Sequence, residues 1–150
     1  MDSIDQIMRV MDSAFDPYWG EAWSRRQVID SLTFPNTYFT LIGERGDISP
    51  KSECVAGFSL VRSTGEEEEL LLLGVCPEFR GHGLGTRLLQ NMFNAAGKRG
   101  AHDIFLEMRS NNPARSLYLA NGFTPIGNRE NYYKLSDGLR MDAITFKKSL

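Results

Sequence analysis

The stretch that decides the fold is Leu70–Leu89, LLLLGVCPEFRGHGLGTRLL. Its opening, Leu70–Val75, is a continuous apolar run, as expected of a strand buried on both faces. Three glycines follow that strand: Gly81, Gly83 and Gly85. Glycine lets a main chain approach a ligand closely, and the first N–H groups of a helix have no internal partners. The segment therefore predicts a site for an anionic group such as a diphosphate, to which Arg80 adds a positive charge.

Two common phosphate-binding loops do not match this segment. A P-loop ends in Gly-Lys-Ser/Thr, whereas this loop ends in Gly85-Thr86-Arg87. The dinucleotide pattern G-x-G-x-x-G also fails, because the last glycine interval is too short. A glycine-rich connection without a ligand stays open as the alternative.

The flanking sequence predicts the remaining elements around this centre. Before it we expect a helix capped by Ser3, a second helix opened by Ser24, and strands over Tyr38–Gly43 and Cys54–Arg62. After it we expect a helix to about Arg99, a strand over Asp103–Met108, a helix from Asn112-Pro113 to Asn121-Gly122, and strands over Asn131–Lys134 and Asp142–Lys147. This order predicts an α/β fold, a mixed sheet with helices packed on it. No repeat or linker interrupts it, so we expect one domain over residues 1–150.

Composition excludes several function classes. The chain has 150 residues with 17 Lys+Arg and 19 Asp+Glu, a net charge of −2, which argues against a nucleic-acid partner. No apolar run approaches the roughly 18 residues of a membrane span, and the N-terminus lacks an uninterrupted signal-peptide core. Cys54 and Cys76 are too far apart in sequence for a metal knuckle. We expect a cytoplasmic protein with no metal and no membrane partner.

Two motifs resemble the GNAT acetyltransferase superfamily. Arg80-Gly81-His82-Gly83-Leu84-Gly85 matches its R/Q-x-x-G-x-G/A signature. Its second motif, N-x-x-A-x-x-x-Y-x-x-x-G-F, is present as Asn111, Ala114, Tyr118, Gly122 and Phe123. The resemblance implies the GNAT fold, a twisted mixed sheet splayed between two parallel strands and flanked by helices. It also implies acetyl-CoA as co-substrate.

The resemblance places the donor along both motifs. The diphosphate would bind the amides of Gly81–Thr86, and the pantetheine arm would lie between Leu70–Val75 and Ile104–Met108. The implied cofactor-binding residues are Leu73, Gly74, Val75, Arg80, Gly81, His82, Gly83, Leu84, Gly85, Thr86 and Asn111. Asn112 is an alternative to Asn111, because the segment after Glu107 is slightly shorter than in related sequences. Gly74 stands where a bulge is expected, and it replaces a commoner alanine.

Other segments resemble RimI-type ribosomal-protein-alanine N-acetyltransferases. They are Leu106-Glu107-Met108-Arg109, Asn131-Tyr132-Tyr133, Asp137-Gly138, Asp142-Ala143 and Trp23-Ser24. This resemblance implies an acceptor that is the N-terminal amine of a protein. Two alternatives stay open. In one, the acceptor is a small-molecule amine; in the other, the chain is a non-catalytic protein that binds acyl-CoA. The oligomeric state is expected to be monomer or homodimer.

The chemistry of acetyl transfer assigns roles to individual residues. The amine must lose a proton before it attacks, and the leaving thiolate is helped by a proton. Glu107 is the candidate base, because its apolar strand neighbours favour proton uptake. Glu69 is the alternative base. The rest of its acidic run, Glu66–Glu69, is expected to be solvated. By resemblance Tyr118 is the acid. Trp23, Tyr132 and Tyr133 are expected to line the acceptor slot, or to be ordinary packing aromatics.

Overall fold

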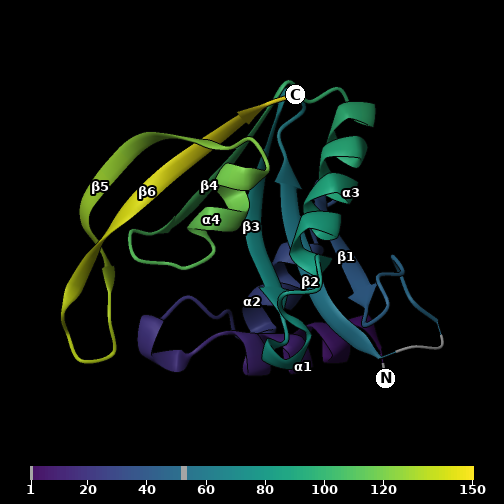
Figure 1. The fold of residues 1–150 in the computed structure, drawn as a ribbon, viewed down its shortest axis with the longest axis horizontal. Helices are drawn as coiled ribbons and strands as arrows, with labels where there is room; N and C mark the ends of the chain where they lie inside the picture. Colours follow the sequence, from purple (N-terminus) through teal and green to yellow (C-terminus); the bar gives the residue numbers. More distant parts are fainter. Residues whose placement is uncertain (1, 52–53) are drawn as a thin grey trace.

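The computed structural model describes residues 2–51 and 54–150, which contain a six-stranded mixed sheet in the order β1-β2-β3-β4-β6-β5 (Figure 1). The strands are β1 Thr37–Gly43, β2 Val55–Ser63, β3 Glu67–Val75, β4 Asp103–Arg109, β5 Thr124–Lys134 and β6 Arg140–Ser149. The helices are α1 Ser3–Ala14, α2 Arg25–Leu32, α3 Leu84–Lys98 and α4 Arg115–Ala120, with short 3-10 turns η1 Pro17–Trp19 and η2 Pro77–Phe79. The predicted mixed α/β fold is confirmed.

Helices cover both faces of the sheet. Leu41 packs in a core cluster with residues of α1 and α2, whereas its neighbour Ile42 packs with the start of α3. Successive strand residues point to opposite faces, so α1 and α2 lie on one face and α3 on the other. Tyr118 of α4 belongs to the same core cluster as α3, so α4 shares its face (Figure 1).

The N-cap of the first helix lies one residue before the predicted one. The side chain of Asp2, not Ser3, accepts a hydrogen bond from the N–H of Asp5 at 2.8 Å. The prediction for α2 is confirmed, because Ser24 and Gln27 form a reciprocal capping box. Both caps satisfy helix N–H groups that lack partners inside the helix.

The centre of the sheet opens between β3 and β4. These strands pair in parallel over Glu67–Glu69 and Asp103–Phe105. Beyond that point β3 continues along β2, and β4 continues along β6, so the ribbons diverge (Figure 1). The predicted splay between two parallel strands is therefore present, and it leaves one edge of β3 facing the gap.

The strand Leu70–Val75 differs from prediction in two ways. Its residues alternate, with Leu70, Leu72 and Gly74 buried and the residues between them partly exposed, so the expectation of two buried faces is wrong for one face. The bulge lies near Leu71, where the register with β2 shifts, and not at Gly74. Gly74 is explained by close packing instead, because a Cβ there would lie 3.1 Å from the ring of Phe15.

The acidic run before this strand is not simply solvated. Glu67–Glu69 belong to β3, and the side chain of Glu68 is 0% exposed. Arg99 donates two hydrogen bonds to the Glu68 carboxylate, both 2.7 Å long. The carboxylate raises the pKa of the Arg99 guanidinium above its usual range. Glu68 thus forms a buried ion pair that joins the start of β3 to the end of α3.

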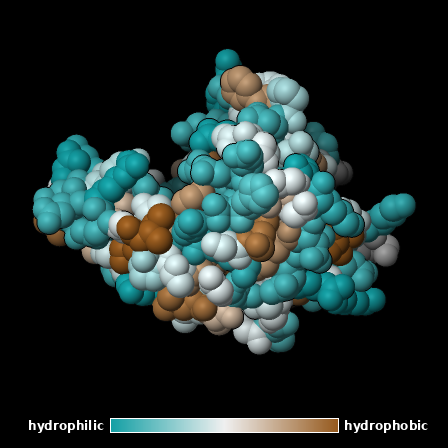
Figure 2. Space-filling model, turned by 90° about the horizontal axis from the view of Figure 1, so that it is seen from above, coloured by the Kyte–Doolittle hydropathy of each residue, from teal (hydrophilic) through white to brown (hydrophobic). Residues whose placement is uncertain are grey.

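The hairpin of β5 and β6 is longer than predicted and stands out from the body (Figure 1). Most of β5 is exposed, and the face of the molecule in Figure 2 is largely hydrophilic with separate small apolar groups. Pairing with β6 holds β5 extended despite Pro125 and Gly127. Across residues 2–51 and 54–150, no helix has the length and apolar character needed to cross a membrane.

Candidate active site

A cavity of about 1200 Å³ occupies the gap between the diverging strands. Its walls come from the α1–α2 connection, β3, the glycine loop, the start of α3, β4, the β4–α4 connection, α4 and β5. The predicted site residues that line it are Trp23, Leu73, Gly74, Val75, Arg80, Gly81, Gly83, Leu84, Gly85, Thr86, Glu107, Tyr118 and Tyr133. The two ends of the cavity differ in chemistry: main-chain amides at one, ionisable side chains at the other.

The glycine loop forms the amide-rich end. Gly81 and Gly83 have φ values of +79° and +81°, which L side chains rarely adopt. Gly83 is the N-cap of α3 and provides no side-chain hydrogen bond, so the first N–H groups of α3 stay open toward the cavity. These donors and the helix dipole make this end suited to a diphosphate.

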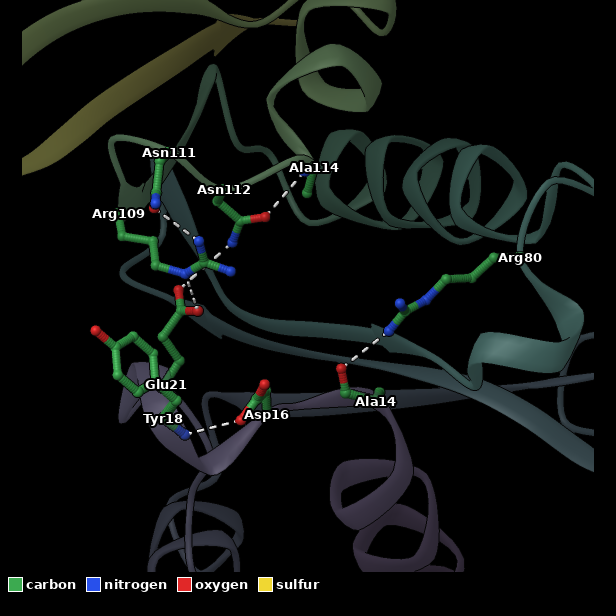
Figure 3. Close-up of polar contacts among 9 residues, drawn as sticks. All are labelled: Ala14, Asp16, Tyr18, Glu21, Arg80, Arg109, Asn111, Asn112 and Ala114. Atoms are coloured by element: carbon green, nitrogen blue, oxygen red, sulfur yellow. Dashed lines mark hydrogen bonds and ion pairs between the residues drawn. The ribbon is translucent and has the colours of Figure 1, made fainter. Parts of the chain in front are cut away.

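Arg80 is fixed by main-chain carbonyl groups beside this loop. Its Nη2 donates to the carbonyl of Ala14 at 2.9 Å (Figure 3). Its Nε donates to the carbonyl of Val75 at 3.0 Å. The guanidinium thus ties the end of α1 to the end of β3. Its charge stays at the cavity wall, where it can favour an anion.

Glu107 lies at the other end, on β4. The Thr145 hydroxyl donates to its Oε2 at 3.3 Å, and Arg129 Nε lies 3.4 Å from the same oxygen. The sequence predicted apolar surroundings from its neighbours along the strand. That prediction is wrong, because the adjacent residues Leu106 and Met108 point to the opposite face and the polar partners of Glu107 come from β5 and β6.

Two tyrosines share this end of the cavity. Burial raises the pKa of both Tyr118 and Tyr133 above the usual range, and the nearby Glu21 carboxylate adds to both shifts. Glu107 raises the pKa of Tyr133 as well. Both phenols therefore stay protonated at neutral pH and are available as hydrogen-bond donors.

An irregularity in β5 orients Tyr133. The register with β6 shifts between Arg129 and Tyr133, and Asn131 has a φ of +53° within this bulge. The N–H of Asn131 donates to Asp142 Oδ1 at 3.0 Å, which holds the bulge in place. Bulges re-aim side chains. Here Tyr133 reaches the cavity, whereas the expected Tyr132 is 50% exposed and does not line it.

The sequence did not point to Glu21, which the structure places in the cavity wall (Figure 3). Its Oε1 accepts a 2.7 Å hydrogen bond from Arg109 Nε, and Asn112 Nδ2 lies 3.5 Å from its Oε2. The ring of Trp19 lies over the Arg109 guanidinium, with 3.9 Å between the ring centroid and Cζ. No short motif could reveal this pair, because its members are 88 positions apart.

The chain is similar to known proteins in both sequence and fold. Residues 4–123 match the acetyltransferase (GNAT) family. The chain belongs to the GNAT family. This GNAT chain is 36% identical to the [ribosomal protein bS18]-alanine N-acetyltransferase of Escherichia coli over 91 residues, 60% of this chain and 61% of that protein. It is 31% identical to the enzyme of that name from Salmonella typhimurium over 123 residues, covering 78% and 82% of the two chains.

A solved structure supports the fold of this GNAT chain. The crystal structure of the ribosomal-protein-S18-alanine N-acetyltransferase from Escherichia coli has a TM-score of 0.81 and 24% identity, covering 99% of this chain and 90% of that one. The chain spans 61–62% of the length of the first curated relatives it matches.

The remaining predicted residues of this GNAT chain differ in whether they line the cavity. His82 does not line it but lines an adjoining surface hollow that shares Gly83, Leu84 and Thr86 with it. Asn111 accepts a hydrogen bond from Arg109 and does not line the cavity, whereas its alternative Asn112 does. Glu69 pairs with Arg62 on the surface and is 46% exposed, so the candidate base that faces the cavity is Glu107.

Proposed function

We propose that this chain is an acetyl-CoA-dependent N-acetyltransferase, one domain over residues 1–150, whose acceptor is the N-terminal α-amino group of a protein. The observation that carries the proposal is the cavity between β3 and β4, which has anion-binding amides at one end and Glu107 with Tyr118 at the other. The names of the relatives support a ribosomal-protein-alanine acceptor. Acetyl-CoA supplies a thioester whose carbonyl carbon bonds to the amine nitrogen as the C–S bond breaks.

The residues along β3 and the glycine loop fit the donor. Gly81 and Gly83–Thr86 line the cavity, where their main-chain amides can bind an anionic group. The β4-facing edge of Leu73–Val75 lies beyond the point where β4 diverges. Main-chain donors on such an edge can hydrogen-bond a carbonyl oxygen and an amide-containing arm. A cavity of about 1200 Å³ exceeds the usual range of about 300–1,000 Å³ for small-ligand sites, which leaves room for an acceptor.

The ionisable residues supply the proton transfers. Glu107 accepts a proton from the acceptor ammonium, which frees the nitrogen lone pair for attack. Tyr118 gives its proton to the leaving sulfur. The bonded nitrogen then loses its second proton, which returns the Tyr118 phenolate to the phenol by way of solvent, and the Glu107 proton leaves to solvent.

The raised pKa of Tyr118 predicts the alkaline side of the pH profile. The acid form of an unshifted tyrosine would be lost near pH 10, whereas burial keeps Tyr118 protonated above that pH. We therefore expect kcat to show no fall from pH 8 to pH 10 in a steady-state pH profile. The Tyr118→Phe variant should lower kcat about 10²-fold or more across that range. A wild-type kcat that falls with an apparent pKa below 10, in an enzyme that stays folded, would contradict this role.

An acetylation screen tests the proposed function. Purified protein with acetyl-CoA is incubated with peptides that begin with Ala, Ser or Met, with an N-terminally blocked peptide containing lysine, and with small amines. We expect mass spectrometry to find an added acetyl group on free N-termini, with the alanine peptide favoured. Acetylation of small amines alone would establish the small-molecule alternative. Tight coenzyme A binding without any product would establish a non-catalytic acyl-CoA-binding protein.

A further inference from the structure

We propose that Glu21 binds the ammonium form of the acceptor amine beside Glu107, an inference that rests on the proposed function. The chain would then use two carboxylates at the acceptor end, one from the α1–α2 connection and one from β4. Their roles differ: Glu107 removes the proton, and Glu21 holds the cation in place before that step.

The position of Glu21 is fixed by its neighbours. Its side chain is 15% exposed, and that of its partner Arg109 is 9% exposed. Arg109 is itself held by Asn111 Oδ1 at 2.7 Å and by the ring of Trp19. Figure 3 shows Glu21 pointing from the α1–α2 connection toward Arg109 and Asn112. A carboxylate held this way is preorganised for a ligand that enters the cavity.

Glu21 retains capacity to accept hydrogen bonds. Oε1 takes the short bond from Arg109, whereas the contact of Oε2 with Asn112 is 3.5 Å long. An ionised carboxylate offers about four lone-pair sites, and an ammonium group has three N–H donors. Because Glu21 lines the cavity, a charged amine can take one of these sites.

Tyr133 connects the two carboxylates. Its phenol lies within the electrostatic influence of both Glu21 and Glu107. Arg109, the partner of Glu21, lies two residues beyond Glu107 on β4, so the two side chains point to the same face and both carboxylates line one end of the cavity. The cations at this end are Arg109, which pairs with Glu21, and Arg129, which lies near Glu107 and is largely exposed. Glu21 and Arg109 balance each other in charge, and solvent screens the exposed Arg129, so this end of the cavity presents a negative charge to an ammonium group.

The test compares two synthetic peptides that differ at one group. One begins with alanine, and its desamino analogue has hydrogen in place of the α-amino group. Calorimetry measures Kd for each on protein saturated with coenzyme A, which prevents turnover. The wild-type protein should bind the amino peptide about 10- to 100-fold more tightly, the range for a hydrogen bond to a charged group. Glu21→Gln should reduce this preference about 10-fold while leaving the Kd for coenzyme A within about 2-fold.

The ratio separates recognition from a structural role. If Glu21 only positioned Arg109, Glu21→Gln would weaken both peptides equally, and the unchanged ratio would overturn the inference. Asp30→Asn on α2 removes an exposed carboxylate paired with Arg26 and should leave both Kd values unchanged. If Glu21→Gln does not fold, Glu21→Asp withdraws the carboxylate by one methylene, and an unchanged ratio in that variant also overturns the inference. If the wild-type protein acetylates peptides but the Kd ratio is unchanged in the Glu21 variant, only the inference about Glu21 is overturned. If the wild-type protein acetylates no amine, the proposed function is overturned as well.

Discussion

Glu107→Gln is expected to lower kcat at neutral pH by about 10²- to 10⁴-fold, the usual contribution of a general base. Glutamine keeps the shape of the side chain and its contact with Thr145 but cannot accept the proton of the acceptor ammonium. The proposed donor site lies mainly along β3 and the glycine loop, so the affinity for acetyl-CoA should change little. Steady-state kinetics with an alanine peptide gives kcat, and calorimetry gives the Kd for acetyl-CoA.

Glu69→Gln is the matched comparison for this variant. Glu69 was the other candidate base, but its carboxylate pairs with Arg62 at 2.8 Å on the surface. We expect it to keep kcat within about 2-fold of wild type, as for a surface substitution. A large loss of kcat in Glu69→Gln with full activity in Glu107→Gln would reverse the assignment. Equal loss of kcat and of acetyl-CoA affinity in Glu107→Gln would show a structural role instead.

Arg99→Met is expected to reduce the free energy of unfolding by about 3–5 kcal/mol. The substitution leaves the fully buried Glu68 carboxylate without its bidentate partner, and removing one member of a buried pair strands a charge away from water. It also removes the guanidinium that lies 4.0 Å from the ring centroid of Tyr38. Urea denaturation followed by circular dichroism measures the change, which is a large part of a typical stability of about 5–15 kcal/mol.

Arg62→Met provides the control for this second variant. It breaks the exposed pair with Glu69, which should contribute about 0–1 kcal/mol. The double variant Glu68→Met with Arg99→Met should recover part of the stability, because it buries no unpaired charge. A stability of Arg99→Met equal to that of Arg62→Met would show that Glu68 finds another partner or becomes solvated.

The parts of the fold set by local sequence were predictable. Gly81 and Gly83 take positive φ values, and Ser24 with Gln27 caps α2, because each depends on residues close in the chain. The elements and their order follow from the same kind of information. The parallel contact of β3 with β4 followed from the family resemblance and not from any local pattern.

The parts set by distant contacts were not predictable. Glu68 looked solvated within an acidic run, and its burial depends on Arg99 from another element. Most of β5 lacked an alternating pattern, because strand β6 and not a buried face keeps it extended. The sequence around Glu21 did not indicate a site residue, because its position depends on the hydrogen bond from Arg109, 88 positions along the chain. Tyr133 lines the cavity and Tyr132 does not, because Asp142 of β6 holds the bulge in β5.

The walls of the cavity come from different parts of the chain. Residues between Leu70 and Thr86 supply the wall made by β3 and the glycine loop, and residues between Leu106 and Tyr118 supply the wall that carries Glu107. The opposite wall comes from the chain's two outer regions, around Glu21 and around Tyr133. Substitutions around Glu21 or Tyr133 therefore change the proposed acceptor end, while the wall made by β3 and the glycine loop keeps its residues.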